Sequence, residues 1–235
     1  MRRLAIPRIV RSCLDRIQER YLLQSTIDED ATVLRFLSGL PSSSALEYLE
    51  VGSGLGRFPL LVLKRFPRFN ITCIEKNRQL ANMTTQAGLN TITGDFTAYS
   101  FPADSYDVIH CSHVIEHLAY PDIASALNKL AAVTRPKGFV IIRSPLMHQG
   151  FYNDLDHIRP YPPEAILSFF ANPQQQLVGD QRVREVLRWY RREAVVFASG
   201  SKLKSTASYV MKSAYCHVGF PRAKPNGFVL ILQRL

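Results

Sequence analysis

A strand that runs into three closely spaced glycines is encoded by Leu49-Glu50-Val51-Gly52-Ser53-Gly54-Leu55-Gly56-Arg57. Glycine adopts left-handed backbone conformations without strain and lets a ligand approach the main chain closely. The apolar residues 60–66 predict a helix after this loop, and the N-terminus of a helix favours polar or anionic ligands. A dinucleotide fingerprint has its third glycine at the position that Arg57 occupies here, so the pattern disfavours NAD.

Strands and helices alternate along the remainder of the chain. We expect strands at residues 45–51, 70–74, 91–93, 106–110, 139–143, about 183–190 and 227–233. Helices are expected at residues 8–24, 29–39, 60–66, 78–87, 121–134, 162–170 and about 202–216, with a turn at 136–138. Alternating strands and helices predict right-handed crossovers and an α/β fold. The expected domains are an N-terminal helical cap over residues 1–44 and a main domain over 45–235, with a basic elaboration at about 172–226.

Composition limits the class of protein. The chain has 235 residues, of which 46% are hydrophobic and 20% charged, so it can bury the core of one ordinary domain. No apolar run approaches the roughly 20 residues that a membrane-spanning helix needs. The four cysteines form no Cys-x-x-Cys pair, which disfavours a zinc ribbon or a disulfide framework and favours a reducing, cytoplasmic setting.

Positive charge is concentrated in the C-terminal part of the chain. The formal net charge is +10, and residues 181–235 hold 11 Lys and Arg against two acidic residues. In strand geometry Arg182, Arg184 and Arg188 share one face. Such a face favours an anionic partner, with a lipid carrier, a membrane surface and RNA as the candidates, and a peripheral position at a membrane. The alternative is a solvated surface without a partner.

Two further signals follow the second and third expected strands. Glu75 ends the second strand, where a carboxylate can accept hydrogen bonds from both hydroxyls of a ribose. Gly94-Asp95-Phe96 ends the third strand, where an acid and an aromatic ring can bind an adenine. Alternatively, Glu75 caps a helix, Asp95 caps a turn and Phe96 belongs to the core. Because the three loops follow the carboxyl ends of successive strands, they converge on the crevice where such sheets bind ligands.

The combined motifs are Glu50-x-Gly52-x-Gly54-x-Gly56, Glu75, Gly94-Asp95-Phe96 and Phe101-Pro102-x-x-x-Tyr106-Asp107-Val108-Ile109. Over about residues 45–170 and the last strand, this set resembles the class I S-adenosylmethionine-dependent methyltransferases. The resemblance implies a Rossmann-like, seven-stranded, mostly parallel sheet with an antiparallel last strand and helices on both faces. It also implies S-adenosylmethionine as the cofactor, with the methionine moiety at the glycine loop, the ribose at the end of the second strand and the adenine at the third. The expected cofactor-binding residues are Glu50, Gly52, Ser53, Gly54, Gly56, Glu75, Asp95, Phe96 and Cys111.

A second group of residues follows the fourth expected strand. His113, Glu116 and His117 are spaced i, i+3 and i+4, which predicts one shared face on a helical turn, and His157 is expected at the same edge of the sheet. In one interpretation, His117 or His157 is the catalytic base that removes a proton from an acceptor hydroxyl. In a second interpretation, these four residues bind a divalent metal. In a third, Glu116 and His117 only position the cofactor lid.

The pair Glu116-His117 resembles the corresponding pair in two families, the quinone-biosynthesis O-methyltransferases and the small-RNA 3′-terminal 2′-O-methyltransferases. Both families carry an acid where this chain has His113. A neutral imidazole cannot supply the negative charge of that acid. The sequence therefore favours His117 and His157 as catalytic bases and predicts no metal, with His113, Glu116, His117 and His157 as the less favoured metal ligands.

The segment from His157 to Glu164 resembles a run in small methyltransferases of polysaccharide and lipid-glycan clusters. With His113, the residues Arg159 and Tyr161 are therefore expected to bind the acceptor. The alternative is a structural loop, in which Arg159 pairs with Asp154 or Asp156 and Tyr161 packs against its surroundings. The expected function is O-methylation of a small molecule, or of a glycan- or lipid-linked sugar, by S-adenosylmethionine. The alternatives are an RNA ribose 2′-O-methyltransferase and a catalytically inactive partner subunit with the same fold.

Overall fold

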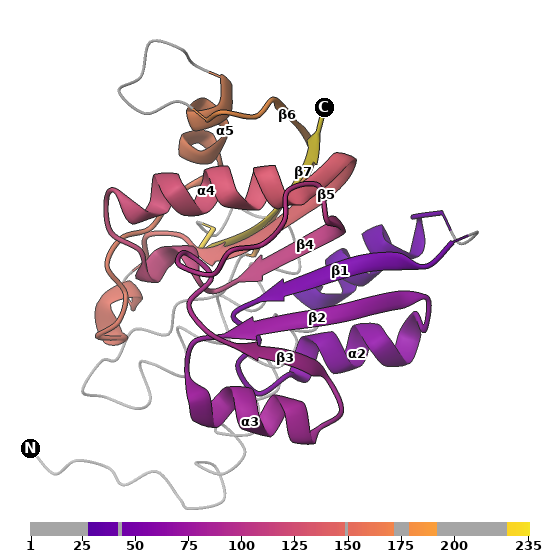
Figure 1. The fold of residues 1–235 in the computed structure, drawn as a ribbon. Helices are drawn as coiled ribbons and strands as arrows, with labels where there is room; N and C mark the ends of the chain where they lie inside the picture. The colour runs from indigo at the N-terminus through magenta and orange to yellow at the C-terminus, as the bar shows by residue number, and fades with distance from the viewer. Residues whose placement is uncertain (1–27, 42–43, 149, 172–178, 192–224) are drawn as a thin grey trace, which may run out of the picture.

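A seven-stranded sheet runs through the chain in the order β3-β2-β1-β4-β5-β7-β6 (Figure 1). Neighbours among β1 to β5 are parallel, whereas β7 is antiparallel to both of its neighbours. The strands are β1 (Leu46–Val51), β2 (Phe69–Glu75), β3 (Asn90–Thr93), β4 (Tyr106–Ser112), β5 (Thr134–Pro145), β6 (Val183–Arg191) and β7 (Gly227–Arg234). The fold class expected from the sequence is confirmed, including the antiparallel last strand.

The computed structural model describes residues 28–41, 44–148, 150–171, 179–191 and 225–235. The expected helices at 8–24 and 202–216, and most of the basic elaboration, lie outside the described residues. The second expected N-terminal helix is present at residues 28–38. The division into a cap and a main domain stays a prediction.

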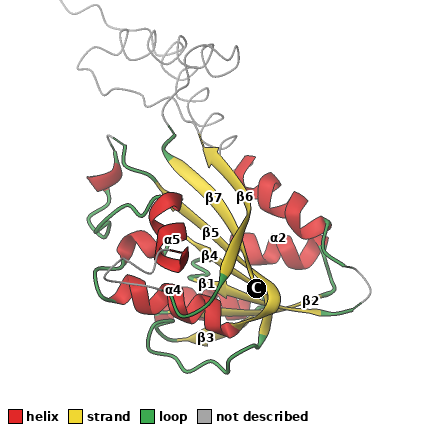
Figure 2. Cartoon of the chain, turned by 90° about the horizontal axis from the view of Figure 1, so that it is seen from above, coloured by secondary structure: helices red, strands yellow, loops and turns green. Residues whose placement is uncertain are grey.

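Helices cover both faces of the sheet (Figure 2). They are the helix at 28–38, α2 (Arg57–Arg65), α3 (Arg78–Gln86), α4 (Asp122–Val133) and α5 (Pro163–Ala171), with two 3₁₀ turns, η1 (Ile115–His117) and η2 (Phe151–Asn153). Successive strand residues point to opposite faces, so Tyr48 of β1 packs in one apolar layer with α2, and Leu49 packs in the other with α4 and α5. These two layers fix the sheet between the helices.

Two elements begin earlier than the sequence predicts. Helix α2 starts at Arg57, directly after the loop, rather than at residue 60. Strand β5 starts at Thr134, so the turn expected at 136–138 is an irregular part of a strand, in which Lys137 has a positive φ of 67°. A Cβ on Gly138 would lie 2.9 Å from the carbonyl oxygen of Asp107, so a glycine allows the two strands to approach there.

The carboxyl ends of the parallel strands meet at one edge of the sheet. The glycine loop follows β1, Glu75 ends β2, the 94–96 segment follows β3, η1 follows β4, and the segment that carries His157 follows β5. Five loops that belong to distant parts of the sequence therefore lie along one edge. In open α/β sheets this edge is where ligands bind.

Candidate active site

The glycine loop has the backbone conformation that the sequence predicts. Gly52 and Gly54 have φ values of 72° and 54°, in the left-handed region that favours glycine. A Cβ on Gly52 would lie only 2.5 Å from Cγ2 of Val114, so the loop is packed against the segment that follows β4. A Cβ on Gly54 would meet nothing within 4 Å. The backbone at Gly54 therefore faces open space that a ligand can occupy.

Glu75 connects this loop to the end of β2. The N–H of Gly54 donates to Oε2 of Glu75 at 2.9 Å, and the N–H of Asn77 donates to Oε1 at 2.9 Å. The hydroxyl of Thr84 donates to the carbonyl oxygen of Gly54 at 2.9 Å. A carboxylate has about four acceptor positions, so each oxygen of Glu75 can accept a further hydrogen bond. This is the pattern that two ribose hydroxyls need.

Glu50 lies in a buried polar group on the same face of the sheet as α2. The hydroxyl of Tyr48 donates to Oε2 of Glu50 at 2.8 Å, and Nδ1 of His110 lies 2.9 Å from both carboxylate oxygens. Burial and the nearby Glu50 carboxylate raise the pKa of Tyr48. Only 2% of Glu50 is exposed, so its carboxylate holds β1 and β4 in position beneath the loop. Its direct contact with a cofactor stays a prediction.

The remaining expected cofactor residues differ in exposure. Asp95 is exposed, and the hydroxyl and N–H of Thr97 hold the pKa of its carboxyl below the usual range. Phe96 and Cys111 are buried in the apolar layer on the α4 side. Ser53 is buried, and its Oγ has no hydrogen-bond partner among the described residues. Stacking of adenine on Phe96 and contacts from Cys111 stay predictions.

The residues after β4 form a tighter turn than the spacing predicts. The 3₁₀ turn η1 extends only over Ile115–His117, and His113 precedes it with a positive φ of 55°. The prediction that His113 belongs to the same helical turn as Glu116 and His117 is therefore wrong, although His113 still lies beside Glu116. Nδ1 of His113 lies 3.1 Å from Oε1 of Glu116, whereas His117 turns toward the segment after β5.

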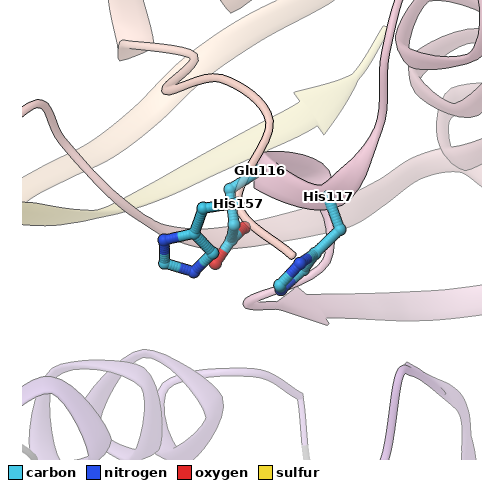
Figure 3. Close-up of side chains that lie close together, drawn as sticks. All are labelled: Glu116, His117 and His157. Carbon is cyan, nitrogen blue, oxygen red and sulfur yellow. The ribbon is translucent and has the colours of Figure 1, made fainter. Parts of the chain in front are cut away.

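Glu116, His117 and His157 lie close together (Figure 3). Their ligand atoms all lie within 4.8 Å of one another. Nδ1 of His117 lies 3.0 Å from the carbonyl oxygen of Asp156, and Nδ1 of His157 lies 2.7 Å from that of Phe151. A carbonyl oxygen can only accept, so each Nδ1 carries the hydrogen and each neutral ring keeps its lone pair on Nε2. Both histidines are thus prepared to bind a proton or a metal at Nε2.

The segment after β5 is attached to this cluster through the backbone. The carbonyl oxygen of Glu116 accepts hydrogen bonds from the N–H groups of Ile158 and Arg159, at 2.9 and 3.2 Å. The hydroxyl of Tyr161 donates to the carbonyl oxygen of Leu118 at 2.8 Å, and the guanidinium of Arg159 lies 5.7 Å from the Tyr161 ring centroid. The structure therefore brings the expected acceptor-binding residues next to the histidines.

Comparison with known proteins decides the family. A family model described as a methyltransferase domain matches residues 17–194, which is more than half of the chain. The chain belongs to the methyltransferase domain family. Its fold is that of the class I S-adenosylmethionine-dependent methyltransferases, as the sequence motifs imply. The open backbone at Gly54, the free acceptor positions of Glu75 and the unpartnered Ser53 Oγ fit that cofactor.

The relatives of this methyltransferase differ in what they act on. It is 26% identical over 131 residues to alpha N-terminal protein methyltransferase 1 of Arabidopsis thaliana, a match that covers 51% of this chain and 47% of that protein. It is 26% identical over 114 residues to tRNA N(3)-cytidine methyltransferase METTL2 of Mus musculus, which covers 43% of this chain and 29% of that protein. The chain thus spans less than half the length of these two relatives. A SAM-dependent methyltransferase from Archaeoglobus fulgidus has the same fold, with a TM-score of 0.59 and 17% identity over 92% of this chain and 97% of that one.

Sequence reasoning missed several residues that support the methyltransferase site. His110 pairs with Glu50 in the register of β4 and β1, and its position between two buried residues of β4 was the available signal. Arg143 of β5 is 3% exposed, and it pairs with Glu29 and Asp30 of the helix at 28–38, at 2.8 and 3.0 Å. Arg143 and Asp30 are 113 positions apart in the sequence, and no local sequence pattern predicts an ion pair between residues so distant.

The basic face of β6 is partly neutralised within the methyltransferase itself. The register shifts between Glu185 and Leu187, which interrupts the alternation expected for the arginines. Arg188 pairs with Glu164 and with Glu185, and the Glu185 carboxylate raises its pKa. The guanidinium of Arg184 donates to the side-chain oxygen of Gln233. An anionic partner therefore stays a prediction.

Membrane insertion has no support in the helices that the structure describes. Not one of them combines the length and the apolar character that crossing a bilayer requires.

Proposed function

We propose that this methyltransferase transfers the methyl group of S-adenosylmethionine to a hydroxyl oxygen of a small molecule, or of a glycan- or lipid-linked sugar. The observation that carries the proposal is the pair of histidines, His117 and His157, whose Nδ1 atoms are held by backbone carbonyls, which leaves the lone pair of each neutral ring on Nε2. An alcohol needs help in losing its proton, and groups of this kind supply it. An amine acceptor needs no such pair once it is neutral.

The site is connected to the cofactor loop. Val114, two residues before Glu116, packs directly against Gly52. The methyl group of a sulfonium is already activated, so the protein mainly has to hold the acceptor oxygen in line with it and exclude water. In this proposal Gly52, Gly54 and Glu75 hold the cofactor, and the segment of Arg159 and Tyr161 holds the acceptor.

The carbon–oxygen bond forms as the carbon–sulfur bond breaks. The electron pair of the broken bond stays on sulfur, which becomes a neutral thioether. The acceptor proton leaves to the histidine cluster or to water bound there. We assign the deprotonation of the acceptor to this cluster, because one ligand atom of each of Glu116, His117 and His157 lies within 4.8 Å of the other two at the described carboxyl edge of the sheet.

RNA ribose methylation is the second candidate. It is favoured by the net charge of +10 and by the match to a tRNA methyltransferase over 43% of this chain. The pairing of Arg188 with Glu164 and Glu185 weakens it, because these contacts compete with phosphate. An acidic lipid carrier would also be attracted by the net positive charge of the chain.

Labelling of a fractionated cell extract tests the proposal. The chain is incubated with methyl-labelled S-adenosylmethionine and with glycan, lipid, RNA and protein fractions. We expect the label in the glycan or lipid fraction or in a small molecule, and we expect it to survive ribonuclease and protease. Label that is lost on ribonuclease treatment would support the second candidate instead.

A further inference from the structure

We propose that Glu116, His117 and His157 bind one divalent first-row metal ion, through the Glu116 carboxylate and the Nε2 atoms of both histidines. The ion binds the acceptor hydroxyl and lowers its pKa. This inference rests on the proposed function, since it assigns the deprotonation step of that function to the ion. It differs from the sequence-based preference, which is a histidine base without a metal.

The ligand atoms already lie near one point. One atom of each residue lies within 4.8 Å of the other two (Figure 3). Bonds of about 2.1 Å place two ligands of one ion roughly 3 to 4 Å apart, so small side-chain rotations close the site. Two imidazoles and one carboxylate are a set that suits Mn²⁺, Fe²⁺, Co²⁺ or Zn²⁺ and leaves positions open for a substrate.

Both histidines are oriented as metal ligands are. A metal-bound histidine almost always donates its other ring N–H to a carbonyl or a carboxylate, which fixes the ring and increases its basicity. Here the backbone carbonyls of Asp156 and Phe151 take the Nδ1–H of His117 and His157. A single catalytic base explains one such arrangement, whereas two histidines oriented in this way beside the Glu116 carboxylate indicate that both rings bind the same ion.

The negative charge of Glu116 has no full counterpart. Glu116 is fully buried, and its carboxylate contacts the hydroxyl of Ser144 at 3.2 Å and Nδ1 of His113 at 3.1 Å. Within the described part of the chain no Lys or Arg pairs with it. By contrast, the buried acids of the helix at 28–38 are paired with arginines, as in Glu29 with Arg143. A buried carboxylate is costly unless it is paired or coordinates a metal, and a divalent ion supplies that charge.

His113 has a role in this site without being a ligand. Its Nδ1 lies next to the carboxylate of Glu116, so it orients that ligand from outside. A second acid is present at the rim, since Oδ2 of Asp154 lies 3.8 Å from Nε2 of His157. The two families named above carry an acid at the position of His113. In this chain the carboxylate of Asp154 can supply the negative charge that His113 lacks.

The reaction balances without a further reagent. The acceptor hydroxyl binds the ion and releases its proton to water. The resulting alkoxide uses a lone pair to bond the methyl carbon, and the bond from that carbon to sulfur breaks with its electrons left on sulfur. The ion neither gains nor loses electrons.

Direct metal binding tests the inference before any acceptor is known. The full chain is dialysed against EDTA, loaded with S-adenosylhomocysteine, and titrated with Mn²⁺ by electron paramagnetic resonance and with Co²⁺ by visible absorption. We expect one ion per chain. Glu116→Gln and His157→Gln should each weaken binding by roughly 100-fold or more, and His113→Ala by about 10-fold to 100-fold.

His148→Gln is the matched control, because His148 follows the same strand but lies outside the cluster. It should keep the affinity of the parent. His117→Gln provides a second ligand variant in case the buried Glu116→Gln does not fold. Binding of no ion, or binding that none of the ligand variants weakens, overturns the inference. If S-adenosylhomocysteine binds normally in that experiment, the proposed function stands with a metal-free base; if it does not bind, the proposed function itself fails.

Discussion

Gly54 and Gly88 both have a left-handed backbone, with φ values of 54° and 94°, and a Cβ on either would meet nothing within 4 Å. They differ in place, since Gly54 faces the proposed cofactor and Gly88 ends α3. Gly54→Ala should therefore destabilise the fold by about 1–2 kcal/mol, through backbone strain, and should also reduce S-adenosylmethionine affinity at least tenfold. Calorimetry and urea unfolding measure the two effects.

Gly88→Ala is the control for that prediction. It should lose similar stability and keep the cofactor affinity of the parent. Equal cofactor affinity in Gly54→Ala and the parent would show that the methyl group at position 54 does not meet the cofactor.

Glu75 is expected to bind the ribose with the acceptor positions that Gly54 and Asn77 leave free. Glu75→Ala should weaken the binding of S-adenosylhomocysteine by about 1–3 kcal/mol, roughly 5-fold to 150-fold. A 2′-deoxy analogue of S-adenosylhomocysteine distinguishes two roles of Glu75, which are binding of the ribose hydroxyls and support of the glycine loop. The parent should bind the analogue more weakly than S-adenosylhomocysteine, and Glu75→Ala should bind the two equally. A variant that still discriminates between them would place Glu75 in a structural role only.

At the level of elements, Arg143 of β5 connects the sheet to the helix at 28–38 through buried ion pairs. Its guanidinium lies 2.8 Å from Glu29 and 3.0 Å from Asp30, and each of the three side chains is at most 8% exposed. Removing one partner of a buried ion pair costs roughly 3–5 kcal/mol when a charge is left without a partner. In Arg143→Met, Glu29 keeps Arg191 and Asp30 keeps Arg57 as partners, so the free energy of unfolding should fall by the lower part of that range, about 3 kcal/mol. Urea unfolding measures this loss.

Arg135→Met is the matched control, because Arg135 pairs with Asp107 at a site where 42% of its side chain is exposed. Exposed pairs contribute little, so the loss should stay within about 1 kcal/mol. Equal losses in the two variants would mean that Arg143 does not anchor the helix.

Elements with a clear hydrophobic period were predictable from the sequence, and exceptions have local causes. Strand β7 and helix α4 lie within one or two residues of their expected bounds, because β7 is a continuous apolar run and α4 has apolar residues at helical spacing. The turn after β4 was expected to be helical because spacing alone cannot show that His113 takes a positive φ. The start of β5 was missed because a proline and a glycine usually mark a turn.

At the level of the whole molecule, the cofactor side of the site was more predictable than the acceptor side. Gly52 and Gly54 lie in the loop after β1, and Glu75 ends the neighbouring strand β2, so topology alone brings them together. The convergence of Glu116 with His157 depends on hydrogen bonds from the N–H groups of Ile158 and Arg159 to the carbonyl oxygen of Glu116, across 42 and 43 positions of the sequence, which no local pattern encodes. The same limit applies to Arg143 and Glu29.

The central claim is methyl transfer from S-adenosylmethionine to oxygen at the histidine cluster. The most direct test uses carbon-13 in the methyl group of the cofactor and follows the product by nuclear magnetic resonance, with the labelled extract fraction as acceptor. The account predicts a new signal in the region of methyl ethers for the parent, and a signal at least tenfold weaker for His157→Gln at unchanged cofactor affinity. A product signal in the N-methyl region, or an undiminished ether signal from His157→Gln, would contradict it.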